Sequence, residues 1–429
     1  MKRVLFSVVL LLAASFTFAQ QKNVKEAKSI ANGSNPDFAK AEQLIEAALT
    51  NAETKDVADT WDVAGFVQKR RSEKEMEKAY LRKPYDTLQV FTSALKMCKY
   101  YLKCDELAQI PNEKGKIKNK FRKANAAAVK AELGNLINGG IQYYNMMLDQ
   151  ERSGNSGEAQ GKKALDCFAM YIDASASPMF EEENLLQTDT VLPQIAYFAA
   201  LAATKVKDYD AVIKYAPYGY SDKENGKYAM EFVVSALKEK GDTDKWLAAL
   251  KEGLQKFPDH AFFFGNLIDY YTNNNKFDEA TAFADEMLAK DPSNTFYLYV
   301  KGYLYHNQYN NLKMDGKNEE ADAALDKGLE FYKKTIEADA NYAEAHSNIG
   351  LIYCLKAQDF SEKAVTDVND PKYAEDQVKL KSFYEQAKPY YEKARALKPE
   401  NKDLWLQGLY RVYYNLNMGP EFEEIGKLM

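Results

Sequence analysis

Three histidines are the residues of this 429-residue chain best suited to act as an acid, a base or a metal ligand near neutral pH. His260, His306 and His346 lie far apart in the sequence, and none stands at the short spacing of a metal-binding pair. The sequence also lacks the HExxH, paired CxxC and GxSxG motifs, and it has no glycine-rich phosphate loop. We therefore predict no catalytic residue, no metal site and no cofactor.

A second group of residues has the chemistry of a binding surface. Phe296, Tyr299, Tyr303 and His306 recur at intervals of three or four residues, which places them on one face of a helix. Aromatic side chains give a large contact area at low entropic cost, so they suit an extended peptide or a sugar ring. We predict that they belong to a partner-binding groove; the alternative is that the rings are partly buried between neighbouring helices. Equivalent positions on the preceding helices hold Tyr228, Glu231, Phe262 and Asp269.

The helices that carry these side chains belong to a repeat. Pro258 and Pro292 are 34 residues apart, which is the period of a stacked helix pair. The unit from Ala261 to Asn294 resembles the tetratricopeptide repeat, although Ile268 stands where that family has a small residue. The resemblance implies an all-α fold, built as a superhelical solenoid. The markers of the two helices are Phe264, Leu267, Ile268 and Tyr271, then Ala280, Ala284, Met287 and Pro292.

Less regular repeats extend on both sides of this unit. We predict about six to seven helix pairs, degenerate over residues 20–190 and more regular over residues 191–429. Two downstream units are stretched, by residues near 306–327 and 354–386, which extend the turn between the two helices of each pair. Such insertions project from one edge of a solenoid, so they either form a shared binding rim or simply elaborate the helix ends.

One function within the family can be tested by residue type. Chaperone-binding members use a carboxylate clamp, which requires Lys and Asn on the first helix of a repeat. Here Gly265 with Asp269, and Ser347 with Leu351, stand at those positions. The sequence departs from the clamp, so we do not expect cytosolic co-chaperone activity.

The first residues resemble an export signal. Lys2 and Arg3 precede an apolar run from Val4 to Ala14, and small residues end at Ala19, which predicts a signal peptide over residues 1–19 that is removed on export. No cysteine follows the run, so we expect no lipid anchor, and no later segment is apolar for long enough to cross a bilayer. Cleavage leaves 55 basic against 63 acidic residues, a net charge of −8, which disfavours nucleic acid as a partner.

Several residues with reactive side chains are expected to be structural. The four cysteines are few and scattered, which predicts buried thiols rather than a disulfide framework. His346 occupies a bulky core position of the repeat, so we predict a packed, hydrogen-bonded side chain. The cysteines are Cys98, Cys104, Cys167 and Cys354.

These observations predict an exported, non-catalytic scaffold of the tetratricopeptide type. Its partner is expected to be an envelope protein or an extended peptide segment, in the periplasm or at the cell surface. The signal sequence, the richness in Tyr and Asn and the insertions resemble exported repeat proteins of Bacteroidetes-type bacteria. The alternative is a glycan- or small-ligand-binding repeat protein at the cell surface, because starch-binding uptake proteins of such bacteria contain similar helices.

Overall fold

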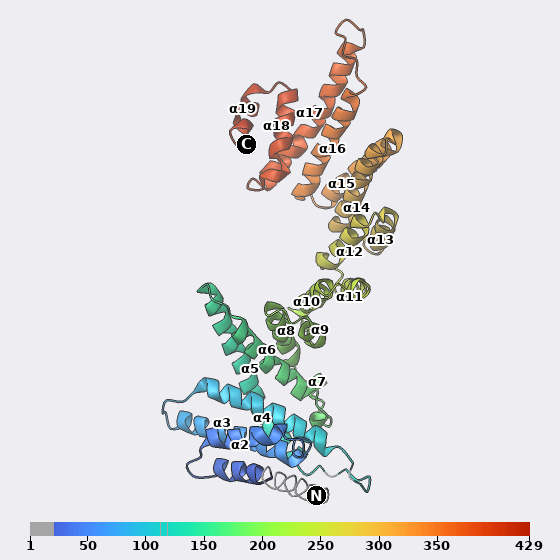
Figure 1. The fold of residues 1–429 in the computed structure, drawn as a ribbon. Helices are drawn as coiled ribbons and strands as arrows, with labels where there is room; N and C mark the ends of the chain where they lie inside the picture. The colour runs from blue at the N-terminus through green and yellow to red at the C-terminus, as the bar shows by residue number, and fades with distance from the viewer. Residues whose placement is uncertain (1–20, 112, 118) are drawn as a thin grey trace, which may run out of the picture. The chain divides into compact units, whose positions relative to one another are not determined.

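The computed structural model describes residues 21–111, 113–117 and 119–429 (Figure 1). The predicted signal peptide, residues 1–19, lies outside the described residues. Over these ranges the chain is helical with no strand, so the all-α prediction is confirmed for them. None of the described helices combines the length and the hydropathy needed to span a membrane.

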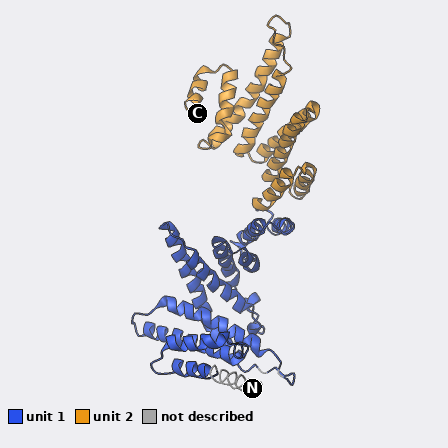
Figure 2. Cartoon of the chain, in the orientation of Figure 1, with its two compact units in different colours: residues 1–260 blue, residues 261–429 orange. Residues whose placement is uncertain are grey.

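The chain forms two compact units, the first ending at His260 and the second spanning Ala261–Met429 (Figure 2). The predicted change in repeat regularity near residue 190 falls inside the first unit and stays a prediction. The helices of the first unit, after a helical segment at residues 21–31, are α2 (Phe38–Thr50), α3 (Ala58–Tyr80), α4 (Thr87–Ala108), α5 (Arg122–Arg152), α6 (Glu158–Ser175), η1 (Pro178–Phe180), α7 (Leu185–Thr188), α8 (Leu192–Lys205), α9 (Tyr209–Tyr215), η2 (Ala216–Gly219), α10 (Gly226–Glu239) and α11 (Thr243–Lys256). Those of the second are α12 (Ala261–Asn273), α13 (Phe277–Lys290), α14 (Thr295–Met314), α15 (Asn318–Ala338), α16 (Ala343–Ser361), α17 (Tyr373–Leu397), η3 (Lys402–Leu404), α18 (Leu406–Asn415) and α19 (Gly419–Gly426).

Within each unit the helices pack mainly against their neighbours in sequence. The first unit contains the pairs α3/α4, α5/α6, α8/α9 and α10/α11, and the second contains α12/α13, α14/α15, α16/α17 and α18/α19. Successive pairs then contact one another, so each core is continuous along the stack, as in a helical-repeat solenoid. The described residues thus hold more pairs than the repeats predict, because segments with weak repeat markers also fold as helix pairs.

The backbone repeats one turn between the two helices of seven pairs. A residue with φ between 54° and 76° ends the first helix, and the next N–H donates to the carbonyl oxygen five residues earlier at 2.8–3.2 Å. This is the Schellman ending of a helix, which favours Gly or Asn because a β-carbon is strained at positive φ. The repeat is therefore visible in the backbone even where its sequence markers are weak. The seven left-handed residues are Arg82, Gly154, Lys207, Gly241, Asn275, Gly316 and Asn417.

The insertion near residues 306–327 lies in helices. α14 and α15 have 20 and 21 residues, whereas α12 and α13 have 13 and 14. The turn at Gly316 keeps the short Schellman geometry, so the added residues lengthen both helices where they pack on each other. In the other stretched unit, α16 and α17 are also long, and the segment 362–372 joins them.

The expected structural roles of His346 and of the cysteines are confirmed. His346 is buried, and its Nε2 donates to the carbonyl oxygen of Ala340 at 3.0 Å. All four cysteines lie in the described part of the chain, where each is buried and none forms a disulfide. Burial raises the pKa of the Cys104, Cys167 and Cys354 thiols to about 12, so these thiols stay protonated and unreactive near neutral pH.

Candidate functional site

The second unit gathers four tyrosines from three consecutive elements. Tyr299 and Tyr303 lie on α14, Tyr332 lies on α15, and Tyr342 directly precedes α16. The Tyr299 ring stacks on Tyr342, with centroids 5.0 Å apart and planes at 28°, and its centroid lies 5.5 Å from that of Tyr332. The Tyr303 phenol lies close enough to influence the ionisation of Tyr299 and Tyr332. We call these four residues the tyrosine cluster.

The cluster presents neutral hydrogen-bonding groups. Burial raises the pKa of Tyr299 and Tyr332, and it raises the pKa of Tyr342 to about 12, so these phenols stay protonated at neutral pH. Asn348 of α16 donates its Nδ2 to the Tyr299 hydroxyl at 3.2 Å. The nearby Glu344 carboxylate is paired with Lys398. The local chemistry is therefore that of hydroxyl and amide groups on aromatic rings, which suits the backbone of a bound peptide.

One hydroxyl of the tyrosine cluster is unsatisfied. The Tyr332 side chain is fully buried, and its OH has no hydrogen-bond partner among the described residues. Its ring packs directly against α14 at Gly302. This contact is possible because Gly302 has no β-carbon, which would lie 2.7 Å from the ring. A buried hydroxyl without a partner destabilises the folded chain.

We therefore expect Tyr332→Phe to leave the free energy of unfolding unchanged or to raise it by up to about 1 kcal/mol, because the substitution removes only the unpaired group. Urea denaturation of the two proteins side by side measures this difference. Tyr309→Phe is the matched control, because the Tyr309 hydroxyl donates to Asp359 at 2.9 Å, and its loss is expected to destabilise the protein. A clear loss of stability in Tyr332→Phe would contradict the conclusion that the Tyr332 hydroxyl has no hydrogen-bond partner.

The remaining predicted residues of α14 differ in accessibility. Tyr303 is 39% exposed, so it is the member of the cluster that a partner reaches first. His306 is half-buried, and burial lowers its pKa, so its imidazole is neutral at neutral pH. Phe296 packs edge-on against Phe264, with centroids 5.8 Å apart. The predicted aromatic stripe is therefore partly core, and its exposed part is centred on Tyr303.

The other predicted positions lie on α10 and α12. On α12, Phe262 packs edge-on against Phe263 at 5.4 Å, and Asp269 is exposed. In the first unit, Tyr228 on α10 is 39% exposed, and its ring meets that of His260 edge-on at 5.8 Å. Glu231 on the same helix pairs with His260 Nε2. The assignment of these residues to a binding groove stays a prediction.

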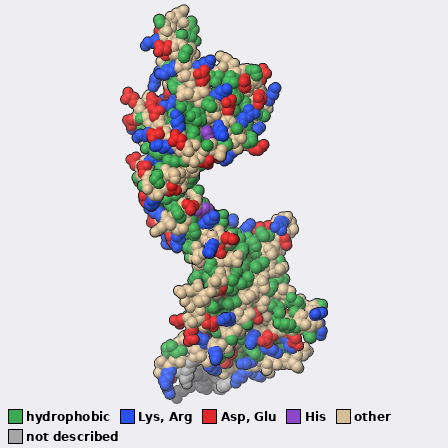
Figure 3. Space-filling model, turned by 180° about the vertical axis from the view of Figure 1, so that it is seen from behind, with side chains coloured by type: hydrophobic (Ala, Val, Ile, Leu, Met, Phe, Trp, Pro, Cys, Tyr) green, Lys and Arg blue, Asp and Glu red, His purple; other side chains and the backbone are tan. Residues whose placement is uncertain are grey.

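Sequence reasoning missed the neighbouring aromatic residues of the first unit. Tyr197 on α8 stacks on Phe232 of α10, with centroids 5.8 Å apart and planes at 28°. Tyr144 of α5 lies near enough to Tyr197 to influence its own ionisation, and Ile141 is exposed beside it on that helix. Hydrophobic side chains gather over this part of the unit (Figure 3). The sequence of α8 could have indicated this surface, because the helix has no charged residue before Lys205.

Comparison with known proteins gives only weak likenesses. No protein-family model matches the chain, and no curated protein matches it. Among solved structures, the tetratricopeptide domain of P58(IPK) has 12% identity and a TM-score of 0.31, covering 93% of this chain and 98% of that one. Yeast Tom70 has 11% identity and a TM-score of 0.35, with coverage of 94% and 82%. A tetratricopeptide repeat protein from Bacteroides fragilis has 15% identity and a TM-score of 0.28, with coverage of 68% and 99%. At such TM-scores these likenesses carry no argument about partners or activity.

Proposed function

We propose that this protein is a non-catalytic scaffold of the tetratricopeptide type, which holds an extended segment of an envelope protein. The observation that carries the proposal is the tyrosine cluster. The exposed Tyr303 and the half-buried Tyr299, Tyr342 and Asn348 form a surface with donors and acceptors beside aromatic rings, while Tyr332 lies buried beneath them. A peptide backbone offers both kinds of hydrogen-bonding group at every residue, and the rings provide contact area at little entropic cost.

The helix-pair architecture supports a binding role. Each pair presents one helix face to its neighbours and another to solvent, so successive pairs align side chains from several repeats. Within the described residues no group of three His, Cys, Asp or Glu side chains is placed to hold a metal ion. The available side chains of the cluster favour noncovalent binding, since none is a charged acid, base or nucleophile.

The proposed location is the periplasm or the cell surface. It rests on the charged start, apolar run and small-residue end of residues 1–19. The partner is accordingly sought among envelope proteins.

The test is partner capture by the chain beginning at Gln20, immobilised and exposed to an envelope extract, with bound proteins identified by mass spectrometry. Tyr303→Ala is expected to weaken the captured complex by about 30-fold, because removing an aromatic hot spot costs ~2 kcal/mol of binding free energy. Tyr414→Ala is the matched control, since Tyr414 is 65% exposed in the same unit but lies outside the tyrosine cluster. Binding constants for each purified complex are then compared.

Equal binding by Tyr303→Ala and the unaltered protein would remove the tyrosine cluster as the site. If no protein is captured and oligosaccharides instead raise the melting temperature, the glycan-binding alternative replaces the scaffold proposal. Aromatic rings with neighbouring hydroxyls and amides also suit a sugar, so this arm tests the same side chains with another ligand.

A further inference from the structure

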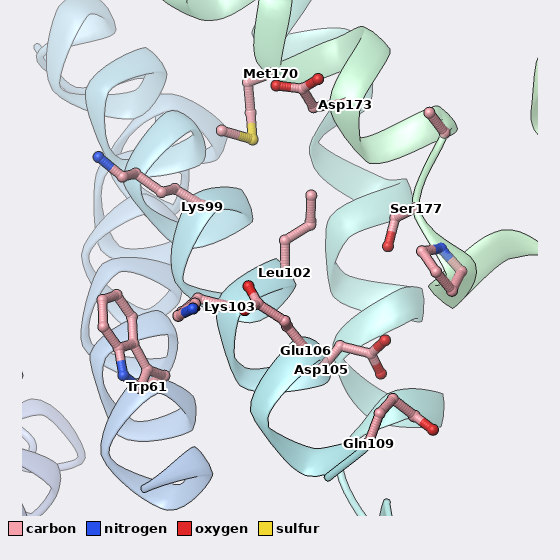
Figure 4. A pocket seen from close by; sticks show the side chains of 12 residues that line it. Trp61, Lys99, Leu102, Lys103, Asp105, Glu106, Gln109, Met170, Asp173 and Ser177 are labelled. Atoms are coloured by element: carbon pink, nitrogen blue, oxygen red, sulfur yellow. Dashed lines mark hydrogen bonds and ion pairs between the residues drawn. The ribbon is translucent and has the colours of Figure 1, made fainter. Parts of the chain in front are cut away.

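The first unit contains a cleft that belongs to none of the surfaces described above (Figure 4). Its volume is about 730 Å³, which lies within the range of ligand-binding clefts. It is bounded by the second half of α4, by the end of α6 with the following Ser177 and Pro178, and by Trp61 of α3.

The apolar part of the cleft includes one ring that is held in place. Leu102, Met170 and Pro178 contribute aliphatic and sulfur surface, and Trp61 contributes an indole ring. The Trp61 Nε1 donates to the carbonyl oxygen of Lys55 at 2.6 Å, and the ring packs edge-on against Tyr100 at 5.9 Å. Because both contacts fix the indole, a hydrophobic ligand group finds a preformed surface.

The carboxylates at the cleft are already neutralised. Asp105 accepts hydrogen bonds from Arg122 at 2.7 and 2.9 Å and from Asn119 at 2.6 Å. Asp173 pairs with Lys214 at 3.0 Å and accepts from the Tyr215 hydroxyl at 2.9 Å. Glu106 pairs with Lys103 at 2.7 Å. None of the three therefore favours a cationic ligand.

Lys99 is the lining charge left without an ion pair or hydrogen bond in the described structure. Asp166 on α6 is influenced by its charge but forms no ion pair with it. Figure 4 shows Lys99 and Lys103 extending on the Trp61 side of α4, with Met170 and Asp173 on the facing helix. The cleft thus combines an apolar surface with one positive charge that forms no ion pair, and the charge favours a carboxylate.

We propose that this cleft binds the free C-terminus of a peptide whose last side chain is hydrophobic. The terminal carboxylate pairs with Lys99, while the last side chain packs on Leu102, Met170 and the Trp61 ring. A C-terminal residue carries its carboxylate and its side chain on the same α-carbon, so one residue satisfies both adjacent features of the cleft. This surface is separate from the tyrosine cluster, so the inference goes beyond the proposed function and either one can fail alone.

The probes are N-acetyl-Leu-Phe with a free carboxylate and the same dipeptide with a C-terminal amide. The chain is labelled with 5-fluorotryptophan, and the ¹⁹F resonance of Trp61 is assigned with Trp61→Phe. We expect the dipeptide with the free carboxylate to shift the Trp61 resonance saturably. The dipeptide amide is expected to bind about fivefold more weakly, because one exposed ion pair contributes a difference of this size. Lys99→Met is expected to reduce binding of the acid to the level of the amide.

The matched control is Lys83→Met, which removes an exposed lysine of the same unit that does not line the cleft. It is expected to leave binding of the acid unchanged. Equal affinity for acid and amide, unchanged binding by Lys99→Met, or no movement of the Trp61 resonance at millimolar probe would each overturn the proposal. So would equally tight binding of N-acetyl-Phe-Asp-Leu-amide, whose only carboxylate is internal. Lys99 is exposed, so the variant is expected to keep the melting temperature of the unaltered protein.

Discussion

Tyr391→Ala is expected to lower the free energy of unfolding of the second unit by about 4 kcal/mol, which is the range for removing a buried aromatic ring. Tyr391 lies on α17, is 5% exposed, and fills the space that two glycines of neighbouring helices leave for it. A β-carbon at Gly350 of α16 would lie 2.7 Å from its ring, and one at Gly408 of α18 would lie 2.2 Å from it. The ring therefore joins three helices at once, and urea denaturation measures its contribution.

A double-mutant cycle tests the fit between Tyr391 and Gly408. Gly408→Ala alone is expected to destabilise by about 2 kcal/mol, because the added methyl group overpacks the ring. In the Tyr391→Leu background, the same Gly408→Ala change is expected to cost much less, since the aromatic ring is gone. Additive effects of the two substitutions would show that contact with the Tyr391 ring does not cause the cost of the added methyl group. Gly419→Ala, where a β-carbon meets nothing within 4 Å, is the control.

A second large effect on stability is expected at Lys301 of α14, which is buried with only 1% of its surface exposed. Its Nζ lies 2.6 Å from Asp285 Oδ1 on α13 and donates to the carbonyl oxygen of Thr281 at 3.3 Å, beneath the rings of Tyr305 and Phe331. Asp285→Asn leaves this ammonium without its counter-charge. We expect a loss of about 2 kcal/mol in the free energy of unfolding, below the value for a fully buried pair because Asp285 itself is 60% exposed.

Lys301→Met is the partner experiment, because it keeps the aliphatic stem among the rings and removes the charge. Its expected loss is under about 1 kcal/mol, since a buried ion pair is often replaced by apolar side chains at little cost. Chemical denaturation of Asp285→Asn and Lys301→Met shows which variant loses more free energy of unfolding. If Lys301→Met were the more damaging substitution, the ammonium would contribute more than its desolvation costs, contrary to this argument.

The candidate site shows where helical spacing stops being informative. Spacing placed Phe296, Tyr299, Tyr303 and His306 on one face of a helix, but a face includes residues at the boundary of the core. Phe296 packs with Phe264, whereas Tyr303 stays 39% exposed, and this difference depends on how closely α12 and α14 approach. Tyr332 and Tyr342 joined the cluster from other elements, at positions that the spacing along α14 does not describe.

The sequence by itself determined the helical class and the pairing of helices, because these follow from periodicity and residue size within one or two turns. It also marked His346 and the cysteines as structural. Tertiary structure alone decided that the insertion near 306–327 lengthens α14 and α15, that the Tyr332 hydroxyl is left unpaired, and that Lys99 lines a cleft without forming an ion pair. Each of these depends on which side chains of different helices meet, and contacts between elements are set by packing rather than by local propensity.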